Sequence, residues 1–301
     1  MKILLLGSNG QLGWQLRRSL SVLGEVTALH RSSAPLCGDL AKPDELARTV
    51  RAVAPDVIVN AAAYTAVDRA ESEPQAAFAI NAGACEVLAA EAGRLGAWLV
   101  HYSTDYVFDG SGERPWTEDD AIGPANVYGR SKLAGEQAVI AGAARHLVLR
   151  TSWVFDTWGQ NFLKSILRAA AQRDSLNVVC DQWGGPTRAA LIADATAHVL
   201  RRLRPELAGT YHLAAAGATH WQAYASLAIA HATECGMVLK TRPEQVHPIP
   251  SSQYPVAAAR PANSRLDTSR LRRTFDLYLP PWQEGVRSVV AELAAFGAKQ
   301  T

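Results

Sequence analysis

The sequence has few cysteines, and they form no pattern that indicates disulfides or a metal site. Among 301 residues there are four, at positions 37, 85, 180 and 235, and no two make a C-x-x-C pair. Disulfide frameworks and zinc sites need cysteines at close, regular spacings, so we expect free thiols and a cytoplasmic protein. Lysine and arginine do not gather in a run, and the net charge is only +2. That charge favours no nucleic-acid partner, and we predict none.

Long apolar runs are also absent. No stretch approaches the ~20 apolar residues of a membrane-spanning helix. The run at residues 2–6 is too short for a secretory signal. We find neither an internal repeat nor a low-complexity tract. With 48% hydrophobic and 19% charged residues, the composition suits a well-packed globular protein without a membrane segment.

What the first half does contain is a regular alternation of apolar strands and helical patterns. We expect helices after a glycine-rich turn at residues 7–13, from Pro43 onward, and between Pro74 and Gly96. Strands are expected at residues 2–6, 26–30, 37–40, 56–63, 98–103 and 146–151. This alternation is typical of an α/β fold with a doubly wound parallel sheet, the Rossmann arrangement.

The alternation weakens after about residue 155. Short helices are expected around 189–203 and 221–234, a strand at 211–213, and a last helix from Pro281 to about Phe296. Residues 181–187 are expected to form a loop, and residues 243–261 are rich in proline with no clear period. We predict a dinucleotide-binding domain over residues 1–155. Residues 156–301 should be mainly a smaller substrate-binding lobe, with about 189–215 and the last helix returning to the main domain.

The glycine-rich turn follows a buried strand and opens a helix. Gly7, Gly10 and Gly13 follow a G-x-x-G-x-x-G spacing. Glycines let the backbone approach a pyrophosphate, and the helix start offers free N–H groups and partial positive charge. The turn therefore predicts a dinucleotide site, and the alternative is a tight turn without a ligand.

Two features bear on which dinucleotide binds. Folds that prefer NAD usually place an acid at the end of the second strand, whereas this chain has His30 and Arg31 there. Arg31 can pair with a 2′-phosphate, so we predict NADPH, with NADH as a second candidate; otherwise Arg31 is a solvated loop charge. Asp39 and Leu40 are placed to flank the adenine, unless Asp39 caps the helix that follows.

Tyr128 and Lys132 lie four residues apart at an expected helix start. This spacing puts a phenol and an ammonium on one helix face. A nearby cation stabilises phenolate and lowers the pKa of a tyrosine, which otherwise lies near ~10. Thr104 follows a buried strand, where its hydroxyl can polarise a carbonyl. Together the three suit proton transfer to a ketone. The alternative is an amphipathic helix with one surface lysine.

These residues and the segments around them match one known superfamily. Thr104, Tyr128 and Lys132 match the Ser/Thr–Tyr–Lys set of extended short-chain dehydrogenases/reductases, and the glycine spacing is a variant found there. Within that superfamily the chain resembles the dTDP-4-dehydrorhamnose reductase family. The matching segments run through nearly the whole chain in order: residues 7–13, 60–68, 101–108, 126–129, 132–136, 150–154, 181–182, 186–187, 260–261 and 263–266.

The resemblance implies NADPH-dependent reduction of the 4-keto group of a dTDP-6-deoxy sugar, the last step of dTDP-L-rhamnose synthesis. Tyr128 would supply the proton, Thr104 would orient the ketone, and Lys132 would hold the nicotinamide ribose and lower the pKa of Tyr128. Asp105 would bond sugar hydroxyls, and Trp153 would pack on the 6-methyl group. Further cofactor contacts implied by the resemblance are Gly10, Gln11, Leu12, Ala61, Ala63, Tyr64, Thr65 and Tyr102.

Some positions depart from relatives or stay open. Some relatives carry glutamates suited to a bridging divalent ion where this chain has Gln15 and Ala190. Without those oxygen ligands we predict no metal, and a monomer or weak homodimer. Arg260 would contact a diphosphate or form a structural salt bridge. The rival functions are a sugar-nucleotide epimerase or dehydratase, and a non-catalytic regulatory subunit similar to that of methionine adenosyltransferase.

Overall fold

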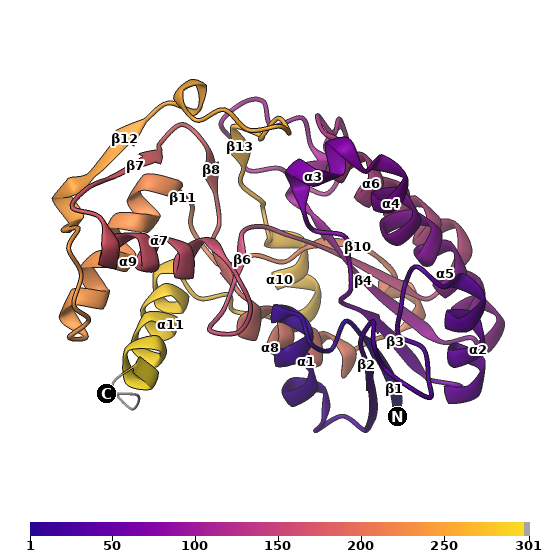
Figure 1. The fold of residues 1–301 in the computed structure, drawn as a ribbon. Coiled ribbons are helices and arrows are strands. Elements are labelled where there is room, and N and C mark those ends of the chain that lie inside the picture. The colour runs from indigo at the N-terminus through magenta and orange to yellow at the C-terminus, as the bar shows by residue number, and fades with distance from the viewer. Residues whose placement is uncertain (298–301) are drawn as a thin grey trace.

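The central sheet is parallel and six-stranded within the described residues. The computed structural model describes residues 1–297 (Figure 1), so the last four residues of the predicted second domain lie outside it. The strand order is β10-β5-β4-β3-β1-β2. Their bounds are β1 Lys2–Leu6, β2 Glu25–Leu29, β3 Val57–Asn60, β4 Trp98–Thr104, β5 His146–Thr151 and β10 Gly209–His212. Short apolar runs buried on both faces give such strands.

Helices cover both faces of this sheet. Alternate side chains of β1 point to opposite faces: Leu5 packs with α1 (Gln11–Leu20) and α8 (Ala189–Leu200). Leu4 packs with α2 (Pro43–Val53), α5 (Ala84–Leu95) and α6 (Val127–Gly142). The two helix layers appear on either side of the strands in Figure 1. The predicted doubly wound Rossmann fold is confirmed.

The helix expected between Pro74 and Gly96 is interrupted by one wider turn. It consists of α4 (Pro74–Phe78), a π-helical turn (Ala79–Gly83) and α5, which ends at left-handed Gly96. Single π-helical turns occur often at functional sites. This turn lies against α6, where a Cβ on Gly135 would stand 2.0 Å from the Asn81 carbonyl oxygen. The wide turn and the glycine together bring α6 close to α5.

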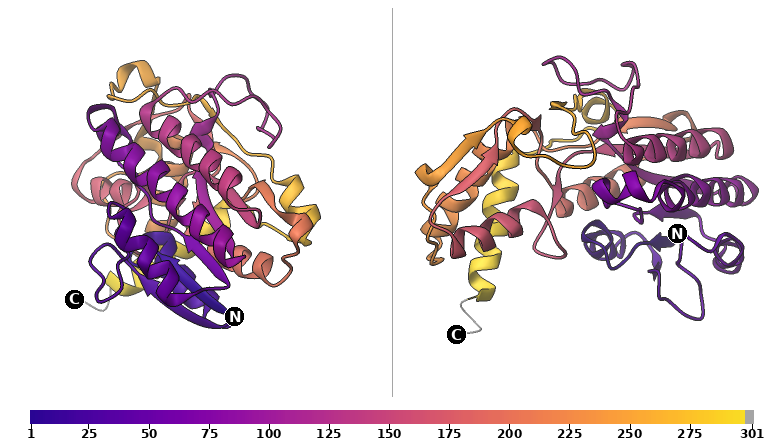
Figure 2. Two further views of the ribbon diagram at one scale, coloured as in Figure 1. Left: turned by 90° about the vertical axis from the view of Figure 1, so that its right-hand side faces the viewer. Right: turned by 45° about the horizontal axis from the view of Figure 1, so that its top comes forward.

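The C-terminal lobe lies to one side of the sheet (left in Figure 1 and in the right-hand view of Figure 2). Three helices form its core: α7 (Phe162–Gln172), α9 (Trp221–Glu234) and α11 (Trp282–Gly297). A small sheet of β7 (Leu176–Val179) and β12 (Val246–Ile249) packs on α9. The remaining helices and short strands are α3 Val67–Ser72, α10 Ser269–Phe275, β6 Val154–Phe155, β8 Trp183–Gly184, β9 Thr187–Arg188, β11 Thr219–His220 and β13 Asn263–Ser264.

The structure corrects two of the predicted segments and adds one strand. Residues 37–40 form no strand, because local side-chain bonds fold them into a turn: Cys37 N donates to Thr49 Oγ1 (2.9 Å) and Ala41 N to Asp39 Oδ1 (3.0 Å). The sheet therefore ends at β2. The expected loop at 181–187 contains β8, and the proline-rich segment 243–261 contains β12.

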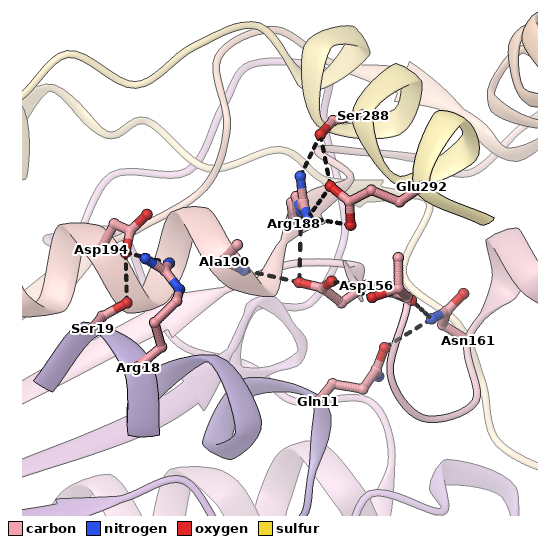
Figure 3. Close-up of polar contacts among 11 residues, drawn as sticks. Gln11, Arg18, Ser19, Asp156, Asn161, Arg188, Ala190, Asp194, Ser288 and Glu292 are labelled. Atoms are coloured by element: carbon pink, nitrogen blue, oxygen red, sulfur yellow. Dashed lines mark hydrogen bonds and ion pairs between the residues drawn. The ribbon is translucent and has the colours of Figure 1, made fainter. Parts of the chain in front are cut away.

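Segments of the second half divide between the two parts. β10 pairs with β5 in the main sheet, and α8 packs on α1, where Arg18 and Ser19 bond Asp194 (2.7 and 2.5 Å, Figure 3). The last helix differs from expectation: α11 packs against α9 and β9, because its apolar face meets the lobe core. We propose a division near residue 155 with 189–215 in the main domain and α11 in the lobe. No helix within residues 1–297 is long and apolar enough to cross a bilayer.

A buried ion pair joins α6 to β5. Arg150 and Glu136, 4% and 1% exposed, make two hydrogen bonds of 2.9 and 2.7 Å. We predict that Glu136→Ala lowers the free energy of unfolding by about 3–5 kcal/mol, because it leaves a buried guanidinium without its partner. Chemical denaturation measures this. As control, Lys42→Ala breaks an exposed pair with Glu45 and should cost below about 1 kcal/mol; equal losses would contradict the prediction.

Candidate active site

A cavity of about 500 Å³ lies at the carboxyl ends of β1, β3 and β4. Ligands of doubly wound sheets bind at this edge. The cavity brings together thirteen of the fifteen predicted cofactor residues: Gly7, Gly10, Gln11, Leu12, Arg31, Asp39, Leu40, Ala61, Ala63, Thr65, Tyr102, Tyr128 and Lys132. Sequence reasoning missed Asn9, Gly38, Asn60, Ala62, Ile80, Ser103, Thr151 and Val154, which also line it. Several of these follow strands, which is the signal that could have found them.

The glycine-rich turn is tight for steric reasons. Gly7 has φ +81, and a Cβ there would stand 2.7 Å from the Ala62 nitrogen. A Cβ on Gly13 would stand 1.9 Å from the Gly7 carbonyl oxygen. Gly13 therefore packs α1 against the turn and does not line the cavity. Gly10 caps α1 without a side-chain bond, so the first N–H groups of the helix remain available to an anion.

The predicted adenine end of the cavity carries one exposed cation. Arg31 lines the cavity, is exposed, and pairs with no carboxylate among residues 1–297. Leu40 lines the same cavity and is buried. Asp39 lines the cavity and also accepts a hydrogen bond from Ala41 N, so it stabilises the turn before α2 as well.

Tyr128 and Lys132 both reach the cavity from the start of α6. Asn126 caps this helix by accepting a hydrogen bond from Gly129 N (2.7 Å). Lys132 is 2% exposed, and its ammonium donates to the Tyr102 carbonyl (2.6 Å) and lies 3.2 Å from His101 Nε2. Burial lowers the pKa of Lys132. The i, i+4 spacing thus places both groups in one site, as predicted.

The expected effect on the pKa of Tyr128 is not what the structure shows. Burial, and secondarily the charge of Asp105, raise the pKa of Tyr128 to about 12, against a smaller lowering by a hydrogen bond with Thr104. Lys132 does not lower it, because the ammonium is directed to the Tyr102 carbonyl and His101. The phenol therefore keeps its proton at neutral pH.

Thr104 and Asp105 lie at the end of β4, next to Tyr128. The Thr104 hydroxyl donates to Asp105 Oδ1 (3.1 Å) and accepts from Tyr106 N (3.2 Å). Asp105 is 2% exposed, and burial raises the pKa of its carboxyl to about 7, although the nearby hydroxyls of Ser264 and Thr104 oppose this. Its Oδ2 is buried without a partner among residues 1–297. Such an oxygen can bond a ligand hydroxyl.

Arg260 lines a second cavity of about 350 Å³, whereas Trp153 lines neither cavity. Trp153 stacks on Trp221 with ring centroids 3.4 Å apart, and Trp221 lines this cavity. Arg260 lines it too and bonds Asp68 (2.7 Å), which is the salt bridge considered from the sequence. The other lining residues were missed: Tyr106, Phe162, Ile166, Asn177, Val178, Val179, Gln182, Tyr254 and Val256. They come from distant segments, and no local sequence pattern marks them.

The two cavities adjoin through a pair of tyrosines. Tyr106 lines the second cavity, Tyr128 lines the first, and their rings meet edge to face with centroids 5.7 Å apart. Tyr64, the remaining predicted cofactor residue, lines neither cavity. Its hydroxyl donates to Glu73 (2.8 Å).

The lobe is tied to the glycine-rich turn by residues 156–161. Asn161 Nδ2 donates to Gln11 Oε1 (2.8 Å, Figure 3), and Trp158 Nε1 donates to the Asn9 carbonyl (2.9 Å). Trp158 also stacks on Trp14 with centroids 4.4 Å apart. These contacts hold the lobe segment over the start of α1.

A polar cluster continues from this segment to α11. Asp156 accepts a hydrogen bond from Ala190 N and faces Arg188, which bonds Glu292 (2.7 Å) and Ser288 (Figure 3). Across residues 1–297, no three His, Cys, Asp or Glu side chains gather in a way that could hold a metal ion. The absence of a metal stays a prediction.

Comparison with known proteins identifies the family. The family model described as RmlD substrate binding domain matches residues 1–295. A dTDP-4-dehydrorhamnose reductase from Salmonella typhimurium is 50% identical, with 97% of this chain and 98% of the relative covered. One from Escherichia coli is 49% identical over the same shares. The chain belongs to the dTDP-4-dehydrorhamnose reductase family.

A solved member of the dTDP-4-dehydrorhamnose reductase family has the same fold. The enzyme from Bacillus anthracis, in complex with NADP, superposes with a TM-score of 0.87 at 32% identity, covering 97% of this chain and 99% of that one. The resemblance stated from the sequence motifs is therefore confirmed over almost the whole chain.

The carboxyl of Asp105 makes the stability of this family member depend on pH. Folding raises its pKa above the ordinary value near ~4, to about 7. The folded state therefore binds this proton more tightly, and the stabilisation present below pH ~4 is lost as pH rises through about 7. We predict that Asp105→Asn removes this loss, so that its stability relative to the native chain rises by about 2–4 kcal/mol between pH ~4 and ~7. Denaturation at a series of pH values measures it, and parallel curves would contradict the prediction.

Proposed function

We propose that this chain reduces the 4-keto group of dTDP-4-dehydro-6-deoxy-L-mannose with NADPH to give dTDP-L-rhamnose. One observation carries the proposal: Tyr128 and Lys132 line the same cavity as the glycine-rich turn, in a chain 50% identical to named reductases. The B. anthracis relative was solved with NADP, which supports this cofactor.

The residues present fit a dinucleotide. The unbonded N–H groups at the start of α1 suit a pyrophosphate, and the exposed Arg31 suits a 2′-phosphate. Lys132 would hold the nicotinamide ribose. When bound, NADPH supplies the hydride that adds to C4 of the sugar.

The chain's own groups then handle the proton. Because burial raises the pKa of Tyr128 to about 12, the phenol enters the reaction protonated and can donate to the ketone oxygen as negative charge develops there. Thr104, whose hydroxyl lowers the pKa of Tyr128 slightly and so lies near it, orients the carbonyl. Asp105 Oδ2 has no protein partner within residues 1–297 and can bond a sugar hydroxyl.

The second cavity suits the nucleotide part of the substrate. Its aromatic walls, Trp221, Phe162 and Tyr254, can stack a base, and Arg260 can meet a diphosphate. This cavity adjoins the first at the edge-to-face pair of Tyr106 and Tyr128. A sugar linked to a nucleotide in the second cavity would therefore reach Tyr128. Trp153 stacks on Trp221 and would hold that indole ring in place.

We predict that Tyr128→Phe lowers kcat by about 10²–10⁴-fold while cofactor and sugar-nucleotide binding are retained, because only the proton donor is lost. The assay couples the chain to the upstream dehydratase and epimerase and follows NADPH absorbance. Stoichiometric NADPH consumption distinguishes a reductase from an epimerase, which keeps its cofactor through turnover, and from a regulatory subunit, which shows no turnover. Unchanged turnover in Tyr128→Phe would refute the proton-donor role.

Cofactor choice gives a second test. Arg31→Asp should reduce kcat/KM for NADPH by about 10–100-fold and change that for NADH little, since it replaces a charge-assisted bond to the 2′-phosphate with repulsion. Arg48→Asp makes the same charge change at an exposed α2 position that lines neither cavity, so it should leave the ratio unchanged. A native preference for NADH would overturn the assignment.

The cytoplasmic location, the absence of a nucleic-acid partner and the monomer or weak homodimer stay predictions.

A further inference from the structure

A buried histidine lies directly behind Lys132. His101 is on β4, is 1% exposed, and pairs in register with Asn60 of β3. Its Nε2 lies 3.2 Å from Lys132 Nζ. Its Nδ1 lies 3.3 Å from Asn60 Nδ2 and 3.6 Å from Cys85 Sγ. All four side chains are 2% exposed or less, so their polar atoms can be satisfied only by one another, by nearby backbone or, for Lys132, by a group in the cavity that it lines.

The donors of Lys132 can be accounted for one by one. A lysine ammonium has three N–H groups and accepts nothing. Among residues 1–297, one N–H is taken by the Tyr102 carbonyl (2.6 Å) and one by His101 Nε2 (3.2 Å). The third remains for the cavity that Lys132 lines. Two fixed acceptors therefore define where the free donor points.

This arrangement requires one form of the imidazole. Because the ammonium can only donate, Nε2 must accept, so the ring is neutral and carries its proton on Nδ1. That proton faces Cys85 Sγ, and Cys85 in turn donates to the Asn81 carbonyl of the π-helical turn (3.2 Å). The Asn60 amide cannot donate to a protonated Nδ1, and it donates to Cys85 Sγ (3.8 Å) instead. Burial and the charge of Lys132 keep the pKa of His101 well below its usual range, in agreement with a neutral ring.

We propose that His101 is a positioning residue for the reduction: as a neutral hydrogen-bond acceptor it fixes the Lys132 ammonium so that its third donor faces the cofactor cavity. The proposal rests on the proposed function, since it assumes that Lys132 holds the cofactor. Without His101, one buried N–H of Lys132 loses its acceptor, and the ammonium turns away from its cavity-facing position or loses its proton.

The first experiment separates the effect of losing the hydrogen-bond acceptor from the effect of changing the size of the side chain. His101→Leu removes the acceptor, whereas His101→Gln offers an amide oxygen in its place. His212→Gln is the matched control, because His212 is also fully buried but bonds the Trp116 carbonyl instead of Lys132. For each variant, kcat, KM for NADPH, KM for the keto sugar, the dissociation constant for NADP⁺ and Tm are measured.

We expect His101→Leu to lower kcat at least about tenfold and to weaken NADP⁺ binding by about tenfold, with KM for the sugar nearly unchanged. His101→Gln should recover most of both losses, and His212→Gln should stay within about twofold of the native chain. A His101→Leu variant with native kcat and NADP⁺ affinity overturns the proposal. So does a His101→Gln or His212→Gln variant that loses as much as His101→Leu, because that pattern indicates structural damage alone.

A second measurement is made on the native chain and uses a variant only to assign the signal. In the native chain labelled with ¹⁵N-histidine, two-bond ¹H–¹⁵N spectra report the tautomer of each of the eight histidines, and the His101→Gln spectrum assigns the signal. A neutral ring with its proton on Nδ1 at pH ~7 supports the proposal. A proton on Nε2, or a charged ring, overturns it.

The two measurements also separate this proposal from the proposed function. If the native chain does not reduce the keto sugar, the proposed function fails. The tautomer and the NADP⁺ affinities of the variants then still decide whether His101 positions Lys132.

Discussion

The burial of one cation beside the sheet edge is the constraint on which the site depends. Lys132 is 2% exposed, and an ammonium can be held there only because hydrogen-bond acceptors meet it. The Tyr102 carbonyl can reach the ammonium because β4 ends beside α6. The helix α6 lies close because the small residues between it and α5 let the two helices approach each other. The position of Lys132 therefore depends both on the end of β4 and on the packing of α6 against α5.

The same closeness explains why the residues behind the site are polar. The π-helical turn directs the carbonyl of Asn81 toward α6, and the Asn81 side chain bonds Ser131 on α6 and the backbone of Tyr64. These bonds fix α6 and the loop after β3 relative to each other. The cofactor cavity is therefore bounded by elements whose spacing is set by hydrogen bonds as well as by apolar packing.

Much of this could be predicted from the sequence, and the failures have physical causes. Apolar runs predicted all five main-sheet strands before residue 155 together with the glycine-rich turn, and the strand expected at 211–213 overlaps β10. The i, i+4 spacing placed Tyr128 and Lys132 together. The predicted strand at 37–40 is absent because side-chain hydrogen bonds fold these residues into a turn, and the pattern of apolar residues does not indicate such bonds. The prediction of a lowered pKa for Tyr128 failed because the burial of the phenol and the direction of the Lys132 ammonium depend on the tertiary structure. The second cavity was missed because residues as distant as Asp68 and Arg260 meet there.

The indole stack of Trp14 and Trp158 has a mechanical consequence. Together with the bonds of Asn161 to Gln11 and of Trp158 to Asn9, it attaches residues 156–161 to the main domain at the glycine-rich turn. A rigid swing of the whole lobe would have to break all three contacts at once. Widening of the second cavity is therefore easier by bending within the lobe, beyond this attachment, so that the glycine-rich turn stays covered while the second cavity opens.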